Sequence, residues 1–550
     1  MIAVMAFGGA AVAESQEPPA PAPPTLPEQQ PVPVQQPEGA NSNSAVPQPE
    51  AKFDVHEYRV LGNTVLSNRE IESVLHPLTG DRKTLADIEA ARAALEKVIH
   101  DHGYTTVFVD LPPQDVSDSI VRFQVKEVRL HEVHIAGARY FSERQILARL
   151  PAATAGTVPN LPALQSQINL LNAQTTDLNV VPTLKAGQEP DAVDLMLNVN
   201  DHLPFHGGLE LNNQNTPDTK PLRMIASLSY DNLFKEFDNV SVQYQASPQE
   251  FNEVRVFAAN YAWGALPDGL RPSVYFLDSD SDVAAVSSYG VLGKGHIFGA
   301  QLGLPLTDAP GMPQSLTLGA EYKHFLQSVV TASPASQAAA AANGGTSVNY
   351  VDLSLGYRGT WASDPAQGTL ATTATYGPRG APNASEAAAN AKATDGASYF
   401  YLKMDGSMVI GLPGQFKLDL RADGQYTDKP LIIYEELSIT GVNAVRGYLE
   451  AESLADRGVV GSIQMQSPTW RQKSTPMGDF FLFYDAGYGR VLDPSPGVAG
   501  AFTPRSWGAG VHLLPGKWIT GSLTWADPLA TGPNTKRGDS RLLFDVRGAF

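Results

Sequence analysis

From residue 204 to the C-terminus, apolar and polar side chains alternate with a period of two in one short segment after another. In RMIASLSYD (223–231) every second residue is apolar and those between are mostly polar, and NVSVQYQA (239–246) and ITGSLTWA (519–526) follow the same pattern. A period of two indicates β-strands. An apolar face outward and a polar face inward suits strands between lipid and a water-filled lumen. About sixteen such segments occur, an even number as in bacterial single-chain barrels. Residues 204–550 therefore predict a transmembrane β-barrel of antiparallel strands.

The connections between these segments differ in length on alternate sides. If the first strand rises from the periplasm, the odd-numbered connections lie outside the cell, and the long ones at 329–347, 378–397, 428–456 and 528–539 all have odd numbers. The even-numbered connections, such as Leu412-Pro413, are mostly short turns. Long loops on one side and tight turns on the other are typical of outer-membrane barrels. A soluble β-sandwich would also alternate, but it would not explain a polar interior face.

The preceding region, 53–200, contains one pattern twice. Residues 53–127 and 128–200 each predict a strand, a short helix, a longer helix and two more strands. Gly62 and Gly137 follow the first strand of each unit, so the order β-α-α-β-β is an internal repeat. The longer helix of the first unit is predicted at 84–102, capped by Thr84, with one apolar face made of Leu85, Ile88, Ala91, Leu95 and Val98. The repeat resembles the POTRA module, and two generic α+β domains are the alternative.

The N-terminal segments have the composition of an export signal and a spacer. Residues 1–13 are apolar and end in Ala11-Val12-Ala13, which is typical of a signal-peptide cleavage site. Residues 14–52 are rich in proline, glutamine and glutamate, a composition that favours an extended linker without a packed core. No stretch of 18 consecutive apolar residues follows, so no transmembrane helix is predicted.

Charge and composition exclude several function classes. The formal net charge is −18 and no basic stripe is present, which argues against a nucleic-acid partner. The absence of cysteine excludes disulfide scaffolds, zinc fingers and thiol catalysis. Neither G-x-S-x-G nor H-E-x-x-H occurs, so we predict no catalytic, cofactor or metal site. A weak acid/base or metal cluster is conceivable from five residues that we interpret as solvated surface groups: Asp110, Asp115, Asp118, His131 and His134.

One long connection interrupts the alternation and carries a charged motif. ITGVNAVRGYLEAES (439–453) contains Val445-Arg446-Gly447-Tyr448, within the predicted sixth outer loop at 428–456. With two POTRA-like units and a barrel of about sixteen strands, this motif resembles the outer-membrane transporters of two-partner secretion. These are the ShlB/FhaC/HecB (TpsB) family of the Omp85 superfamily. The resemblance covers residues 53–550.

The resemblance implies a site and a function. In the family the sixth loop folds into the pore and its arginine meets an acidic wall residue, which here matches Asp485. Phe481, Phe483, Asp485 and Gly487 of FFLFYDAGYG would share the lumen face, and Gly447 would allow a tight turn. The implied function is export of a large exoprotein of haemolysin or adhesin type, with the POTRA pair capturing it in the periplasm. The alternatives are a barrel insertase of the same superfamily and a diffusion porin.

The C-terminal strand adds a second implied feature. In RLLFDVRGAF (541–550), Leu542, Phe544, Val546 and Phe550 would face lipid. A terminal phenylalanine on a closing strand resembles the signal read by the outer-membrane barrel assembly machinery. The expected partners are therefore the exported protein, outer-membrane lipids and that machinery during biogenesis.

Overall fold

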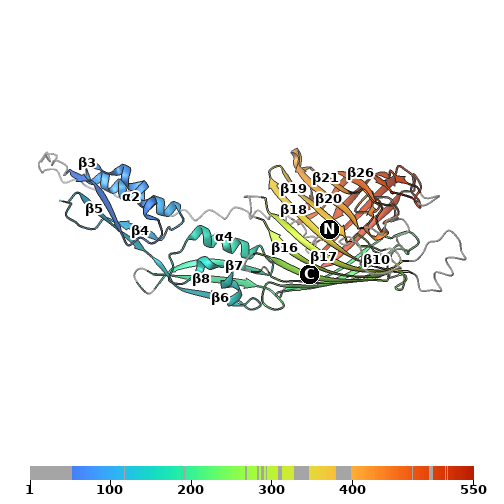
Figure 1. Ribbon diagram of the computed structural model, residues 1–550, viewed down its shortest axis with the longest axis horizontal. Helices are drawn as coiled ribbons and strands as arrows, with labels where there is room; N and C mark the ends of the chain where they lie inside the picture. The colour runs from blue at the N-terminus through green and yellow to red at the C-terminus, as the bar shows by residue number, and fades with distance from the viewer. Residues whose placement is uncertain are drawn as a thin grey trace. The chain divides into compact units, whose positions relative to one another are not determined.

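The computed structural model describes residues 52–550 except 117, 188, 190–191, 265, 267–268, 281–283, 287–289, 293, 307–311, 328–345, 379–397, 474, 495–498, 515 and 517. The predicted signal segment and linker, and most of the fourth and fifth outer loops, lie outside the described residues. The chain divides into two compact units on either side of the Leu203–Pro204 bond (Figure 1). Among the described residues, no helix is both long and apolar enough to cross a membrane.

The first half of the N-terminal unit contains two small sheets and two helices. Its elements are β1 (Phe53–Val55), β2 (Glu57–Leu61), α1 (Asn68–Leu75), β3 (Gly80–Lys83), α2 (Leu85–Asp101), β4 (Val107–Asp110) and β5 (Ile120–Glu127). The strand predicted over 53–63 is two strands, because β1 pairs antiparallel with β3 while β2 pairs parallel with β5. The helices begin where side chains satisfy their first N–H groups, since Ser67 and Thr84 both form capping boxes.

The apolar face of α2 differs by two residues from the predicted one. Ile88, Ala91 and Leu95 are buried as expected, but Leu85 is 59% exposed and Ile99 is buried instead. Leu85 is the first helical residue, and its side chain lies beyond the part of the helix that packs on the sheet. The buried face joins Phe123 and Val125 of β5 in one core.

The second half repeats the first. It contains β6 (Arg129–Ala136), α3 (Glu143–Ala148), α4 (Leu161–Asn172), β7 (Leu178–Ala186) and β8 (Ala192–Asp201), with sheet order β6-β8-β7. The corresponding order in the first half is β2-β5-β4. Gly62 and Gly137 have φ of 83° and 94°. A Cβ at these positions would lie 2.6 Å from the Val125 carbonyl oxygen and 2.2 Å from that of Val199. Both halves therefore need glycine at the same point of the repeat.

Residues 204–550 form a closed antiparallel barrel of sixteen strands, which confirms the predicted fold class (Figure 1). The strands are β9 (Phe205–Asn212), β10 (Arg223–Asp231), β11 (Asn239–Ala246), β12 (Arg255–Ala262), β13 (Arg271–Ser279), β16 (Lys294–Pro305), β17 (Gln314–Gln327), β18 (Thr346–Ser363), β19 (Ala366–Gly377), β20 (Tyr399–Gly411), β21 (Lys417–Thr427), β24 (Arg457–Gln466), β26 (Thr475–Arg490), β28 (Arg505–Leu513), β29 (Ile519–Pro528) and β30 (Arg541–Ala549). Strand β30 closes the barrel by pairing with β9.

Short strands flank the barrel wall. They are β14 (Ala284–Val286), β15 (Gly290–Leu292), β22 (Leu437–Ser438), β23 (Leu454–Ala455), β25 (Trp470–Gln472) and β27 (Ala501–Phe502). One of the sixteen strand segments predicted from the sequence spans about 289–304, but the barrel strand there begins only at Lys294, because residues 290–292 pair with 284–286 in a separate hairpin.

The two faces of a barrel strand differ sharply in exposure. On β26, Phe480 and Leu482 are 62% and 61% exposed on the outer face, whereas Phe481, Phe483 and Asp485 on the inner face are 3%, 5% and 0% exposed. Such burial of inward side chains shows that they contact other residues inside the barrel. The C-terminal Phe550 is 61% exposed, and its ring occupies the space where a Cβ of Gly207 would lie, 2.5 Å from the ring. Phe550 also exchanges backbone hydrogen bonds with Gly207 at 3.0 and 3.2 Å.

Candidate functional site

The connection between β21 and β24, residues 428–456, is called loop 6 here. Its side chains and backbone contact the inner face of strands from β17 to β30, so it lies inside the barrel. The short pair β22–β23 forms the base of the lobe 439–453. Within that lobe Gly441 and Gly447 have φ of 123° and 92°, a left-handed region that favours glycine. These turns interrupt the alternation in the sequence.

Arg446 makes the densest set of contacts in the lobe. Its Nε donates to Asp485 Oδ2 at 2.7 Å and its Nη2 to Asp485 Oδ1 at 2.8 Å, which is a bidentate pair. Nη1 donates to Gln464 Oε1 at 2.8 Å, Nη2 also donates to Ser462 Oγ at 3.0 Å, and the Arg446 backbone N–H donates to Asp485 Oδ2 at 3.1 Å. The Arg446 side chain is 12% exposed and that of Asp485 is 0% exposed. Both charges are therefore largely removed from water.

Aromatic rings on the wall complete the surroundings of this pair. The Arg446 guanidinium carbon lies 3.5 Å from the centre of the Phe483 ring, a cation–π contact. The rings of Phe483 and Phe481 lie against β28, where a Cβ at Gly508 or Gly510 would come within 2.6 or 2.3 Å of them. Glycines on one strand thus make room for the phenylalanines of the next.

The other predicted site residues lie in the same region. A Cβ at Gly487 would be 3.1 Å from Val445 Cγ2, so Gly487 accommodates the buried Val445. Gly447 lies beside Ala526 of β29. Tyr448 is 1% exposed, and its hydroxyl donates to the carbonyl oxygen of Ala530 at 2.7 Å or of Arg505 at 3.1 Å. Burial raises the pKa of Tyr448, so its hydroxyl is a permanent donor.

Three glutamates of loop 6 were missed by sequence reasoning. Glu452 accepts hydrogen bonds from the N–H groups of Leu449, Asn534 and Thr535 at 3.1, 2.7 and 2.7 Å. Glu450 accepts one from Val442 N–H at 2.7 Å, and burial raises its pKa to about 7. Their spacing does not distinguish them from solvated loop acids. The only signal was that these three are among six acidic residues in a loop already expected to enter the lumen.

The third glutamate, Glu435, ends the short 3₁₀ helix η4 (Ile433–Glu435). It is 3% exposed, and Lys323 of β17 donates to it at 2.6 Å. Burial acts to raise the pKa of this carboxyl, but Lys323 and Lys403 outweigh that effect and hold the pKa below its ordinary value. Glu435 is therefore ionised at neutral pH.

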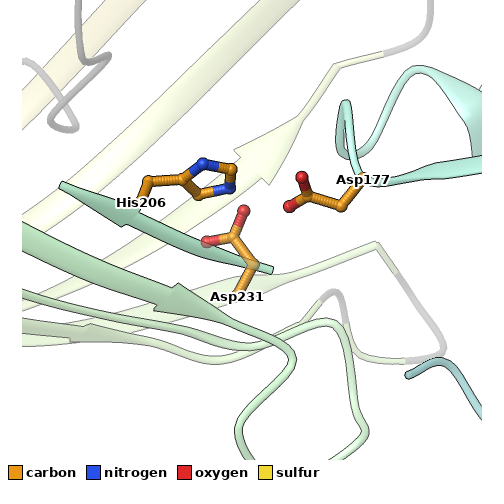
Figure 2. A group of neighbouring side chains, drawn as sticks. All are labelled: Asp177, His206 and Asp231. Carbon is orange, nitrogen blue, oxygen red and sulfur yellow. The ribbon is translucent and has the colours of Figure 1, made fainter. Parts of the chain in front are cut away.

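The five polar residues set aside as surface groups have local partners or lie at exposed positions. Asp110 pairs with Lys126 at 2.5 Å, His131 with Asp194 at 3.3 Å and His134 with Glu132 at 2.9 Å. A different set of side chains appears in Figure 2, where His206 and Asp231 come from the paired strands β9 and β10, and Asp177 from the N-terminal unit. Because Asp177 belongs to a separate compact unit, no binding site is assigned to this set.

Two family models match the chain. Residues 53–127 match the POTRA domain of ShlB type, and residues 348–512 match the haemolysin secretion/activation protein family ShlB/FhaC/HecB. The second match includes loop 6 and the wall strand β26. It therefore covers both sides of the contact between Arg446 and Asp485.

Similarity to known relatives extends over most of the chain. The heme/hemopexin transporter protein HuxB of Haemophilus influenzae is 21% identical over 501 residues, which is 88% of this chain and 85% of HuxB. The outer membrane transporter CdiB of Dickeya dadantii is 22% identical over 502 residues, or 87% of this chain and 83% of CdiB.

Solved structures have the same fold. CdiB from Escherichia coli matches with a TM-score of 0.63 at 20% identity, covering 93% of each chain. BamA from Haemophilus ducreyi lacking POTRA domains 1–3 matches with a TM-score of 0.54 at 14% identity, covering 90% of this chain and all of that one. These likenesses show the fold, and the two family models identify the chain as a TpsB outer-membrane transporter of the ShlB/FhaC/HecB family, in the Omp85 superfamily, whose POTRA domains are periplasmic.

Proposed function

We propose that this transporter exports a large partner exoprotein of haemolysin or adhesin type through its barrel lumen to the cell surface. The observation that carries the proposal is loop 6, which is folded inside the barrel and held by the bidentate contact between Arg446 and the fully buried Asp485. A loop fixed in this way occupies the passage at rest and must shift for a chain to pass. The relatives named as transporters, HuxB and CdiB, support the same class of function.

The POTRA sheets favour capture of the partner as an added strand. An extended segment can bind a sheet edge through main-chain hydrogen bonds. In the first unit the outer edge of β4 is already occupied, because Glu96 accepts from Val109 N–H at 3.0 Å and Arg92 donates to the Val109 carbonyl oxygen at 2.9 Å. Strand β2, at the other edge, pairs only with β5 among the described strands. We therefore assign capture to the β2 edge.

The two edge strands of the sheet in the second unit differ in the same way. Asn172 of α4 bonds both the N–H and the carbonyl oxygen of Val180 on β7, at 2.8 and 3.0 Å, and Pro182 lies in that strand two residues later. A proline has no N–H to offer an added strand. The opposite edge strand, β6, pairs only with β8 among the described strands. Thr157 and Gly156 bond the N–H and the carbonyl oxygen of Leu130 at 2.9 and 2.6 Å, so the corresponding capture surface is the part of the β6 edge beyond Leu130.

Co-expression with a candidate exoprotein of the proposed class tests the proposal. With the transporter present, we expect the exoprotein in the medium or exposed to added protease on intact cells. Without the transporter, it should stay in the periplasm. An exoprotein that stays periplasmic in both strains, together with loss of other outer-membrane barrels when the transporter is depleted, would instead favour a barrel assembly factor.

A separate prediction concerns biogenesis. We propose that Phe550 is read by the barrel assembly machinery, since its ring is presented on the outer face of the closing strand. Deleting Phe550 should lower the amount of heat-modifiable barrel in the outer membrane severalfold, while export per inserted molecule stays close to wild type. Phe400→Ala removes another outer-face ring, 50% exposed, and should leave the yield unchanged. Equal yields from the two variants would contradict the signal role.

A further inference from the structure

Loop 6 is attached to the barrel at a second place, far from Arg446 in the fold. Glu435 accepts hydrogen bonds from Lys323 Nζ of β17 at 2.6 Å, from the Tyr350 hydroxyl of β18 at 2.7 Å and from the Tyr401 hydroxyl of β20 at 2.7 Å. The exposed fractions of Glu435, Tyr350 and Tyr401 are 3% each. Three strands of one wall therefore bind a single carboxylate of the loop.

The wall side of this attachment is a socket of charged and tyrosine side chains from the barrel strands. Lys323 Nζ also lies 2.8 Å from Asp352 Oδ2 and 3.0 Å from Glu321 Oε2, and its side chain is 9% exposed. The hydroxyl of Tyr399 donates to Asp352, and that of Tyr275 donates to Glu321. Lys323 would thus keep two carboxylate partners if Glu435 were neutralised. The socket is held by the barrel itself and does not depend on the loop.

Neighbouring contacts fasten the backbone beside Glu435 to the same wall. Gln425 of β21 donates to the carbonyl oxygens of Glu435 and Asp456 at 2.9 and 3.0 Å, which joins the two ends of the loop. The Tyr434 ring stacks on Phe325 of β17 with 4.2 Å between centroids. Residues 431–436 are therefore packed and hydrogen-bonded on the β17–β20 wall, and we call them the root of loop 6.

The lobe 439–453 is bound to a different wall. Arg446 contacts β24 and β26, and the Tyr448 hydroxyl contacts the ends of β28 and β29. Arg541 of β30 donates to the Tyr448 carbonyl oxygen at 2.7 Å. Arg421 of β21, between the two walls, donates to the carbonyl oxygen of Asn443. Root and lobe are joined only through the β22–β23 base, so each has its own set of wall contacts.

We propose that Glu435 is a second anchor of loop 6, which keeps the root on the β17–β20 wall while the lobe leaves the β24–β30 wall to admit the exported chain. Glu435 is a positioning residue in this scheme. The exported chain passes along the wall that carries Asp485, and the root stays in the lumen throughout. The anchoring stands on the contacts alone, and only the path of the exported chain rests on the proposed function.

Single-cysteine reporters measure the two attachments separately, because the chain has no cysteine of its own. Leu431→Cys reports on the root and Ala444→Cys on the lobe, at positions 4% and 7% exposed. Maleimide labelling in outer-membrane vesicles, with no partner present, gives the rate at which each becomes accessible. Glu435→Gln should speed labelling at 431 about tenfold, since the ion pair with Lys323 and one of the two acceptor oxygens are lost. Labelling at 444 should change less than about twofold.

Arg446→Ala should give the opposite result, with faster labelling at 444 and an unchanged rate at 431. Asp428→Asn, which removes an exposed charge from the same loop, should alter neither rate. If Glu435→Gln lowers barrel yield, Tyr401→Phe removes one bond to the anchor and should raise labelling at 431 by a smaller factor. Unchanged labelling at 431 in both variants, or equal acceleration at 431 and 444 by Arg446→Ala, would overturn the second anchor.

A reversible tether tests whether the lobe moves during export. Val445→Cys with Gly487→Cys places two thiols where the wild-type Val445 side chain approaches the wall at 3.1 Å from a Cβ at position 487. Because both positions lie in the site, export by the reduced double variant is the baseline; oxidation should stop this export and a reductant should restore it. Undiminished export by the oxidised protein would contradict movement of the lobe while leaving the labelling results, and hence the anchor, unaffected. Absence of export by the unsubstituted transporter, with the expected labelling, would count against the proposed function instead.

Discussion

Replacing Arg446 or Asp485 with alanine is expected to reduce export at least tenfold per inserted barrel, with assembly close to wild type. A surface ion pair is worth only about 0–1 kcal/mol. Here Asp485 is fully buried, and removing one partner of a buried pair costs about 3–5 kcal/mol because the other charge is left stranded. The lobe then has no fixed position, and because its root stays anchored in the lumen the freed lobe obstructs the passage. Secretion of the partner exoprotein, normalised to heat-modifiable barrel, measures the effect.

Three further variants make this test specific. The double variant should lose less than the sum of the two single losses, because the second substitution removes a charge that is already stranded. Arg446→Lys keeps the charge but loses the planar fork that bonds both oxygens of Asp485, so its export should be intermediate. Arg490→Ala removes an exposed arginine from the same strand as Asp485 and should export normally. Additive losses, or wild-type export by Arg446→Ala, would show that the pair does not hold the loop.

Deleting residues 53–200 is expected to abolish export while the barrel still inserts. The barrel is a compact unit from Pro204 onward, and its strands pair with one another to closure, so its fold does not require the POTRA pair. The exoprotein, in contrast, would lose the sheet edges on which an extended segment can add as a strand. Insertion is measured by heat modifiability and export by the exoprotein in the medium.

Two smaller deletions separate the contributions of the domains. Deleting 53–127 alone removes the β2 edge and leaves the β6 edge, and deleting 128–200 does the reverse. Each should lower export, and neither should lower barrel yield. Secretion at the wild-type level by the complete deletion would refute capture by these domains.

Local patterns in the sequence were sufficient to predict most of the helices and strands. The period of two placed Phe481, Phe483 and Asp485 on one face of β26, because a strand turns alternate side chains to opposite sides whatever its neighbours are. The capping residues Ser67 and Thr84 marked helix starts, since a cap acts within three residues of itself. Gly62 and Gly137 indicated the repeat, because the positive φ that each adopts is likewise a local property of the chain.

Contacts between residues far apart in the chain could be identified only from a family resemblance or from the tertiary structure. The contact of Arg446 with Asp485, 39 residues away, was anticipated only through the resemblance, and Ser462 and Gln464 were not anticipated at all. Glu435 and Lys323 lie 112 residues apart, and nothing local to either indicates the other. Alternation tells which side chains face the lumen, but not which of them meet across it. That depends on how the closed barrel staggers its strands and on the path of loop 6 between the two walls, and both arise only when the whole chain packs.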